Sequence, residues 1–139
     1  GLMTVQLKCH PGIGPAVTGE ALVAQDNFSA RYDLDRIKGI FSRPQHALVG
    51  QSYVDKILVV NTAKGGVASA WMLYEMASRG LAPKAILFNA ANTILAQGAA
   101  FASMAMCDRF ADGDITALVH TGETLLVEPE KGLVTITSR

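Results

Sequence analysis

A cation and two glycines stand a few residues after an apolar run near the middle of this 139-residue chain. Residues 57–60 predict a buried strand, and good helix formers begin after Gly66. In a tight strand-to-helix turn, the first N–H groups of the helix lack partners and lie at the positive end of its dipole. Lys64 would add a charge there, and Gly65 and Gly66 would let a ligand approach the backbone. The pattern predicts either an anion-binding turn or an ordinary connection, and it is not a Walker A loop because Lys64 precedes the glycines.

A long polar connection, residues 28–55, precedes this strand. Such a connection inside a small domain is more often a functional loop than filler. It contains Arg31 and His46. We expect His46, between Pro44 and Gly50, to be exposed, either as a ligand contact or as a hydrogen-bonded loop histidine.

Regular elements are predicted on both sides of the turn. Apolar or alternating runs indicate strands at residues 5–9, 19–23, 57–60, 85–88, 104–107, 124–127 and 133–136, the last two forming a hairpin. Helices are expected at residues 68–79, with Gly80 at C′, and from a cap at Asn92 or Thr93 to about residue 101. Residues 115–120 fit either a helical turn or a short strand. The predicted core stripe of the first helix consists of Ala68, Trp71, Met72, the stem of Glu75, and Met76.

Composition narrows the possible classes of protein. Half of the residues are hydrophobic, enough for one core, so we expect one domain over residues 1–139, with Gly1 and Leu2 a cloning remnant before Met3. Lys plus Arg and Asp plus Glu number 12 each, so no net charge points to nucleic acid or an anionic membrane. Neither a membrane span nor a signal peptide is apparent. Cys9 and Cys107 are far apart and share no metal-ligand spacing, which favours a reduced, cytoplasmic setting.

The order of these elements predicts the fold class. Strands at both ends surround a central β-α-β-α-β section, whose helices should cover one face of a sheet. The terminal strands then supply a second sheet or a barrel side. An α/β fold of layered β/β/α type is therefore expected.

Five short segments carry a family pattern over nearly the whole chain. They are residues 14–23 (GPAVTGEALV), 46–51 (HALVGQ), 80–86 (GLAPKAI), 94–99 (ILAQGA) and 121–127 (TGETLLV). In this order they resemble the small, swivelling subunit of the aconitase X proteins, with Ala47 where that family has proline. On this resemblance the chain is identified as a member of the family.

The resemblance implies a swivelling β/β/α domain, with small mixed sheets or a barrel-like β layer and helices on one side. It also implies a larger partner subunit that carries an iron or iron–sulfur centre as Lewis acid, so no metal or cofactor is expected on this chain. Together the two subunits would dehydrate a hydroxy acid. Activities in the family include dehydration of a phosphorylated mevalonate and of cis-3-hydroxy-L-proline.

The resemblance breaks at the central turn. The family commonly has Gly-Arg-Gly-Ser-Ser-x-x-Ser there, with a serine as proton acceptor, whereas residues 63–70 here read AKGGVASA. Gly66 and Val67 stand where the serines would be. Ser69, in the first helical turn, is either a replacement proton acceptor or a residue that caps backbone groups.

Two main functions follow as hypotheses. In the first, the chain is the swivel subunit of an aconitase X-type hydro-lyase, inactive without its large partner. Lys64, Gly65 and Gly66 would bind the substrate carboxylate, Ser69 would transfer the proton, and Arg31 and His46 would complete the polar wall. In the second, the chain is a non-catalytic binding or regulatory module on the same fold, as the missing serines favour. A phosphohistidine carrier is a weaker third possibility, because none of the histidines has a phospho-acceptor signature.

Overall fold

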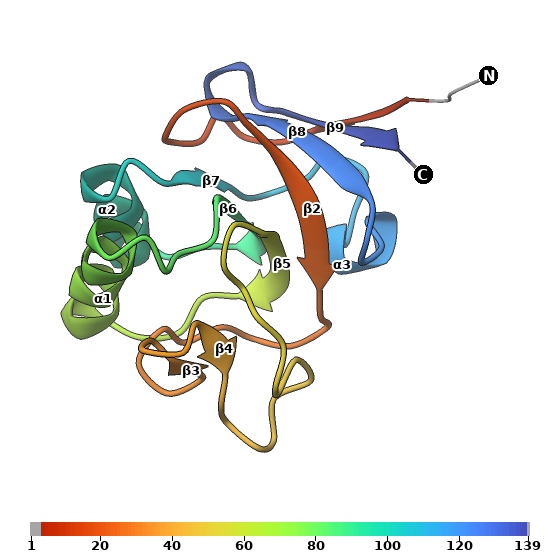
Figure 1. Ribbon diagram of the computed structural model, residues 1–139. Helices are drawn as coiled ribbons and strands as arrows, with labels where there is room; N and C mark the ends of the chain where they lie inside the picture. Colours follow the sequence, from red (N-terminus) through yellow and green to blue (C-terminus); the bar gives the residue numbers. More distant parts are fainter. Residues whose placement is uncertain (1–3, 139) are drawn as a thin grey trace.

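The structure is a computed structural model that describes residues 4–138, so the predicted cloning remnant at Gly1 and Leu2 lies outside the described residues (Figure 1). Its strands are β1 Val5–Lys8, β2 Val17–Val23, β3 Leu34–Asp35, β4 Ile40–Phe41, β5 Ile57–Thr62, β6 Ala85–Ala90, β7 Ala105–Cys107, β8 Thr124–Glu128 and β9 Leu133–Ser138. Its helices are α1 Val67–Ser78, α2 Thr93–Phe101, α3 Ile115–Leu118 and the 3₁₀ turn η1 Pro129–Lys131. The main sheet has the order β1-β9-β8-β2-β5-β6-β7, and β3 pairs only with β4.

Half of the main sheet is parallel and runs through β2, β5, β6 and β7. Ile57–Val60 and 85–88 are fully buried, as expected for parallel strands covered on both faces. Helices α1 and α2 make the two crossovers and lie side by side on one face of the sheet (Figure 1). The carboxyl ends of these strands therefore meet at one edge, where open α/β sheets bind their ligands.

The other half is antiparallel. Strands β8 and β9 form the predicted hairpin around η1, which ends at Gly132 with φ of 62°. Strand β1 pairs with β9, with Val5 opposite Ile136. Strand β2 pairs antiparallel with β8 and parallel with β5, so it joins the two halves.

The two ends of this sheet are brought together. Beyond β1, Ile13 and Met106 exchange backbone hydrogen bonds of 3.0 and 2.9 Å, and the Ala111 N–H donates to the Lys8 carbonyl (2.8 Å). The chain after β1 is thereby joined to β7 and its continuation. The predicted barrel-like β layer is confirmed, and the terminal strands extend the same sheet through β2.

Alternate side chains of β5 enter two separate cores. Leu58 and Val60 pack beneath α1 and α2. Ile57 and Val59 point into the curved inner face, where Ile115 of α3 also packs. Residues 115–118 are therefore a helical turn, the first of the two alternatives that the sequence allowed. Within residues 4–138, none of the helices has the length and apolar character needed to cross a membrane.

Helix α1 lies within one residue of its predicted bounds, but its predicted core stripe is only partly right: Met76 is buried and Met72 packs against the core, whereas Ala68, Trp71 and Glu75 are exposed. Gly80 has φ of 70° and ends the helix as expected. The buried side chains are Ser69, Leu73 and Met76, whereas Trp71 is 68% exposed. The helix has two apolar stripes, and hydrophobicity alone does not show which of them packs on the sheet.

Candidate functional site

Residues 63–66 turn sharply from β5 into α1. The Lys64 N–H donates to the Phe28 carbonyl (2.8 Å), which ties the turn to the long connection. Gly65 has φ of 109°, a conformation that residues with side chains rarely adopt. Gly66 is the N-cap residue of α1 and has no side chain that could accept from the first helical N–H groups. These donors therefore remain available to a ligand or to solvent.

A cleft of ≈ 290 Å³ opens beside this turn. It is lined by Asp26, Asn27, Ser29, Tyr32, Asp33, Arg43, Lys64 and Gly65. Lys64 is exposed, and the Arg43 side chain is one-third exposed. The predicted turn residues Lys64 and Gly65 thus share a cleft with a second cation, Arg43, which the sequence analysis did not single out.

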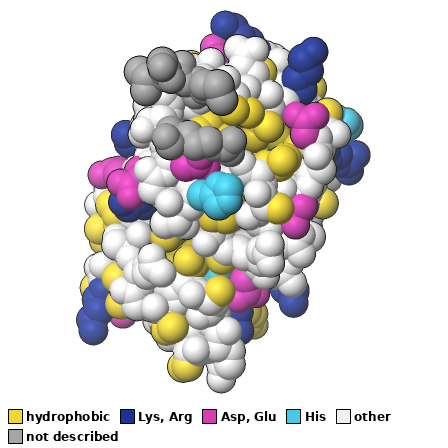
Figure 2. Space-filling model, turned by 90° about the vertical axis from the view of Figure 1, so that its right-hand side faces the viewer, with side chains coloured by type: hydrophobic (Ala, Val, Ile, Leu, Met, Phe, Trp, Pro, Cys, Tyr) yellow, Lys and Arg dark blue, Asp and Glu magenta, His cyan; other side chains and the backbone are white. Residues whose placement is uncertain are grey.

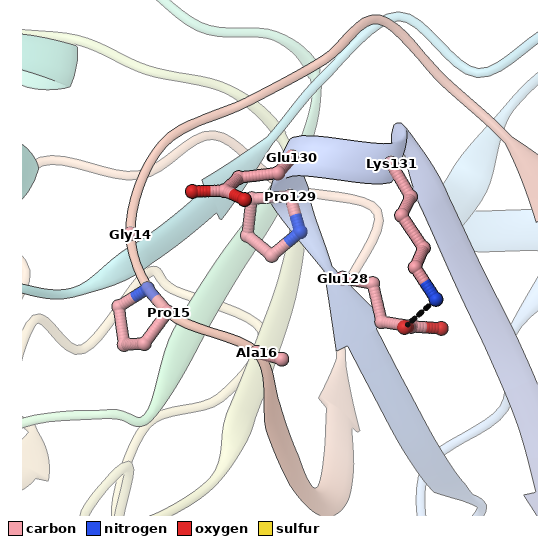
Figure 3. A pocket seen from close by; sticks show the side chains of 7 residues that line it. All are labelled: Gly14, Pro15, Ala16, Glu128, Pro129, Glu130 and Lys131. Atoms are coloured by element: carbon pink, nitrogen blue, oxygen red, sulfur yellow. Dashed lines mark ion pairs between the residues drawn. The ribbon is translucent and has the colours of Figure 1, made fainter.

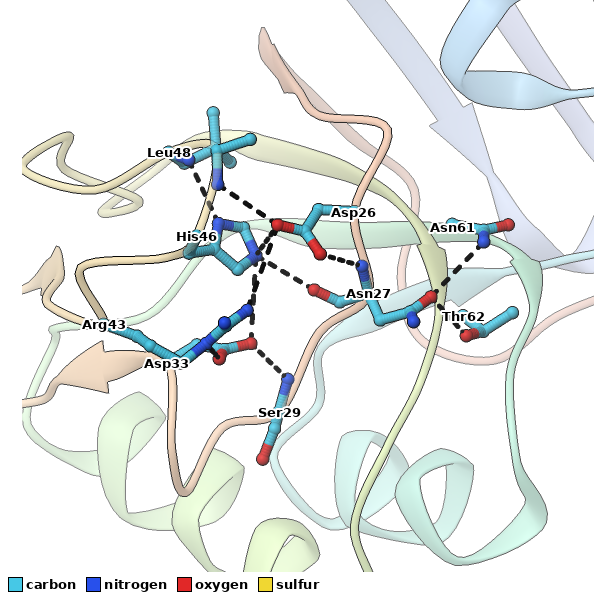
Figure 4. A network of polar contacts seen from close by, with 10 residues as sticks. Asp26, Asn27, Ser29, Asp33, Arg43, His46, Leu48, Asn61 and Thr62 are labelled. Atoms are coloured by element: carbon cyan, nitrogen blue, oxygen red, sulfur yellow. Dashed lines mark hydrogen bonds and ion pairs between the residues drawn. The ribbon is translucent and has the colours of Figure 1, made fainter.

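Arg43 is held in place by carboxylates (Figure 4). Its Nε donates to Asp33 Oδ1 at 2.6 Å, and its Nη2 lies 3.9 Å from Asp26 Oδ2. The other Asp33 oxygen accepts from the Ser29 N–H at 2.8 Å, and the Asp33 side chain is only 4% exposed. A buried carboxylate paired in this way fixes the planar guanidinium.

Asp26 balances the charge of the cleft on its other side. Partial burial disfavours its ionised form, but the N–H groups of Ala47 and Asn27 donate to its carboxylate and hold its pKa below the ordinary value. The cleft therefore contains two cations, Lys64 and Arg43, and two carboxylates, Asp26 and Asp33.

His46 is buried at 2% exposure, so it is not exposed as expected; it is the hydrogen-bonded loop histidine of the two alternatives. Its Nδ1 accepts from the Leu48 N–H (3.0 Å), so its Nε2 carries the proton and donates to the Asn27 carbonyl (2.9 Å). Its ring stacks on Phe41 with 4.6 Å between centroids. Because both nitrogens are satisfied and the ring face is packed, burial of the neutral ring costs little. His46 therefore holds the loop around Asp26 and Asn27 behind the cleft.

Arg31 and Ser69, like Gly66 and His46, lie outside the cleft lining. Arg31 is exposed, and its guanidinium carbon lies 5.3 Å from the centroid of the Tyr32 ring. Ser69 is 1% exposed and belongs to the buried face of α1. A Cβ on Gly65 would collide with the Ser69 hydroxyl, so the absence of a side chain at Gly65 is what leaves room beside that oxygen.

Amide side chains gather at the carboxyl ends of β5 and β6. Asn89 Nδ2 donates to Asn61 Oδ1 (3.1 Å) and to Asp114 Oδ1 (2.8 Å). Hydrogen bonds from the Asn89 and Thr116 side chains hold the pKa of Asp114 below its usual value. The sequence analysis missed this group, although Asn61 and Asn89 each directly follow an apolar strand run, which was the available signal.

A second cleft of ≈ 290 Å³ lies at the ends of β6 and β7, lined in part by Asn92, Asp108 and Arg109. Beside it the fold brings Cys9 and Cys107 into contact, although they are 98 positions apart in the sequence. The hydrogen bond from Cys107 lowers the pKa of the Cys9 thiol, while the same bond and burial raise that of Cys107. Among residues 4–138, no three His, Cys, Asp or Glu side chains form a possible metal-ligand set.

A third cavity, of ≈ 200 Å³, lies beside η1 (Figure 3). Its one cation, Lys131, is paired with Glu128 at 2.9 Å. With this cation neutralised and Glu130 also in the lining, the cavity has no evident chemistry.

The fold and the cleft define an α/β domain with a closed β layer and a turn, where its parallel strands end, that contains a cation and two glycines. The model of the aconitase X swivel domain matches residues 6–136, and the chain belongs to this family. It is 31% identical over 132 residues to the phosphomevalonate dehydratase small subunit of Thermococcus sibiricus, covering 95% of this chain and 98% of that one. It is 26% identical over 138 residues to the protein of the same name from Methanococcoides burtonii, covering 99% and 100%.

A solved structure agrees with these relatives. Aconitase X of Thermococcus kodakaraensis in its holo form matches with a TM-score of 0.87 and 30% identity, over 95% of this chain and 98% of that one. The family predicted from the sequence, a family of dehydratase subunits with a swivelling domain, is confirmed.

Proposed function

We propose that this chain is the small, swivelling subunit of an aconitase X-type hydro-lyase that removes water from a hydroxy acid together with a large subunit. The observation that carries the proposal is the meeting of Lys64, Gly65 and Arg43 in one cleft at the start of α1. Two cations and a helix N-terminus there provide the charge and the donors that a carboxylate needs. The relatives named small subunits support the existence of a large partner.

The proposed substrate is a hydroxy acid such as cis-3-hydroxy-L-proline. The relatives' names point instead to phosphomevalonate, which carries both a phosphate and a carboxylate. The cleft here balances Lys64 and Arg43 with Asp26 and Asp33, so its formal charge is zero. A balanced cleft favours a zwitterion, whose carboxylate meets the cations and whose amine meets Asp26, over a polyanion.

In this proposal each residue of the turn has one role. Lys64 and the Gly65 and Gly66 backbone bind the carboxylate. Arg43 completes the polar lining of the substrate site, the role that the sequence suggests for Arg31 and His46. Ser69 accepts or relays the proton through the space that Gly65 leaves open. The iron or iron–sulfur centre that the family resemblance implies is assigned to the large subunit. A cytoplasmic setting suits Cys9 and Cys107, which are free thiols in contact.

The test is reconstitution with the large aconitase X subunit of the same organism. Water loss from cis-3-hydroxy-L-proline and from phosphomevalonate is measured for the chain alone and for the complex. We expect no turnover by the chain alone and turnover of the zwitterion by the complex. Turnover by the chain alone would contradict the division of labour, and turnover of phosphomevalonate only would correct the substrate.

Lys64→Ala tests the binding role in the same assay. Losing a charge-assisted contact is worth on the order of 2–4 kcal/mol, so kcat/KM should fall roughly 30- to 800-fold. The matched control is Lys131→Ala, since Lys131 belongs to η1, outside the cleft, and pairs with Glu128. Equal kcat/KM values for the two variants would show that Lys64 does not bind the substrate.

The second candidate function, a binding or regulatory module without its own chemistry, is favoured by Gly66. That residue stands where the family's serine is expected, and the nearest hydroxyl in the helix, Ser69, is buried. In this case the complex would bind the hydroxy acid, measured by calorimetry, without releasing water from it.

A further inference from the structure

The outward stripe of α1 meets an outward stripe of α2, and between them lies an apolar groove of ≈ 380 Å³. We call it the α1–α2 groove. Its lining residues are Val67, Ala70, Trp71, Tyr74, Ile94, Gln97, Gly98 and Phe101. Trp71 is 68% and Phe101 79% exposed, so large apolar side chains here face water.

Small residues at the helix crossing create this groove. A Cβ on Gly98 would lie only 2.6 Å from the Ala70 Cα, so the two helices approach as closely as their backbones allow. Larger side chains flank the crossing, with Trp71 and Tyr74 edge to face at 6.3 Å between centroids. The groove is therefore a built feature of the helix pair, with a narrow floor and aromatic walls.

The helices also lack the charges of a surface that stays in water. Helix α2 contains no charged residue and α1 contains only Glu75. A solvent-exposed helix normally carries a charged outer face. The face on the opposite side of the molecule shows the ordinary pattern, with charged side chains of both signs spread over it (Figure 2). Aromatic residues without charges are the composition of the core of a permanent interface.

We propose that the α1–α2 groove is the docking site of the large subunit, an inference that rests on the proposed function. Val67 belongs to the groove and directly follows Gly66, so the groove is continuous with the turn that must face the large subunit. A second copy of this chain seated in the groove would crowd that turn and keep the large subunit away. The segment that docks is apolar, with an acceptor for the Trp71 indole N–H or the Tyr74 hydroxyl.

Binding of the large subunit by wild-type and variant chains, measured by calorimetry without substrate, tests this. Trp71→Lys and Phe101→Lys put a charge into the groove from exposed positions, so the fold should survive, which circular dichroism and thermal melting check. The matched control is Ile37→Lys, because Ile37 is 81% exposed and outside the groove. We expect a Kd at least about 30-fold weaker for each groove variant and unchanged for Ile37→Lys.

Two outcomes would overturn the docking site alone. They are unchanged affinity of the groove variants, and a wild-type dimer in sedimentation that Trp71→Lys dissolves without affecting large-subunit binding. An absence of binding by the wild-type chain would overturn both the docking site and the proposed function. The proposed function fails differently. If the groove variants weaken the complex but the wild-type complex dehydrates no hydroxy acid, the proposed function is wrong and the docking site is supported. If the complex is active and both lysine variants bind as well as the wild type, only the docking site is wrong.

Discussion

Gly66 is the residue on which the two candidate functions differ. A Cβ at this position would meet nothing within 4 Å, and φ is −123°, so a serine side chain would not collide with its neighbours. Gly66→Ser should stabilise the fold by about 0.5 kcal/mol in urea denaturation, because its hydroxyl can cap α1 and the unfolded chain loses freedom. If Ser69 serves as proton acceptor, we expect turnover of the complex to change less than about threefold.

The control for this substitution is Gly66→Ala, which adds a Cβ without a hydroxyl. An inactive parent complex that gains turnover with Gly66→Ser but not with Gly66→Ala would show that the natural chain is a non-catalytic module. The proposed role of Ser69 would then be lost.

Ser69→Ala tests that role directly. Removing a proton acceptor should lower kcat of the complex by roughly a hundredfold or more while leaving α1 folded. Ser78→Ala is the matched control, since Ser78 is an exposed serine of the same helix, and its hydroxyl donates to the Glu75 carbonyl (2.8 Å). A normal rate with about 1 kcal/mol lower stability would make Ser69 a structural residue.

Part of the candidate site can be predicted from local sequence and part cannot. Lys64, Gly65 and Gly66 are adjacent to an apolar strand, so a local pattern is enough to find them. Arg43 reaches the same cleft only because the buried Asp33, ten positions earlier, holds its guanidinium. The burial of His46 likewise depends on packing against Phe41, which no local pattern shows.

At the level of elements, the crossing of α1 and α2 is the tightest contact between helices. Gly98→Ala would place a Cβ 2.6 Å from the Ala70 Cα and 2.8 Å from its carbonyl oxygen, so the backbone of α1 must move. Overpacking of this kind typically costs 1–3 kcal/mol, against a gain of about 1 kcal/mol in helix propensity. We expect a net loss of about 1 kcal/mol in the free energy of unfolding.

Ala100→Gly measures the contribution of helix propensity alone, because Ala100 is an exposed residue of the same helix. This variant should lose up to about 1 kcal/mol in the free energy of unfolding. A stabilised Gly98→Ala variant would mean that the two helices lie further apart than described.

The strands and helices themselves follow closely from the sequence. Runs such as 57–60 and 85–88 are apolar without interruption, and Asn92 caps α2 as predicted, accepting from the Leu95 N–H at 2.7 Å. Which side of α1 packs on the sheet cannot be predicted, because both its Leu73 side and its Trp71 side are apolar. The two sides differ only in what they contact in the folded protein.

For the whole molecule, the carboxylates set the response to acid. The pKa values of Asp26 and Asp114 are lowered from 3.8 by hydrogen bonds they accept in the folded state. A lowered folded pKa contributes stability that is complete above the unfolded value and is lost as pH falls through the folded value. The free energy of unfolding should therefore be level from pH 7 to about 5 and fall below about pH 4.

Asp26→Asn and Asp114→Asn should each destabilise the protein at pH 7, by less than about 1 kcal/mol because both sites are near solvent. The difference from the wild type should vanish at the acid end. Asp112→Asn, at an exposed position, serves as the comparison. A gap between wild type and variant that widens as pH falls would contradict the assignment.

The pairing of the first strand with the last has a practical consequence. Val5 lies opposite Ile136, so the described residues 4–138 begin and end at the same corner of the fold, across the sheet from α1 and α2 (Figure 1). The polypeptide is nearly a closed loop, and a linker of a few residues from residue 138 back to residue 4 would complete it. New ends could then open in the exposed connection around Gly113, giving a circular permutant with the same sheet order. An affinity tag or fluorescent protein joined next to residue 4 or residue 138 would likewise lie on the side of the sheet away from the helices.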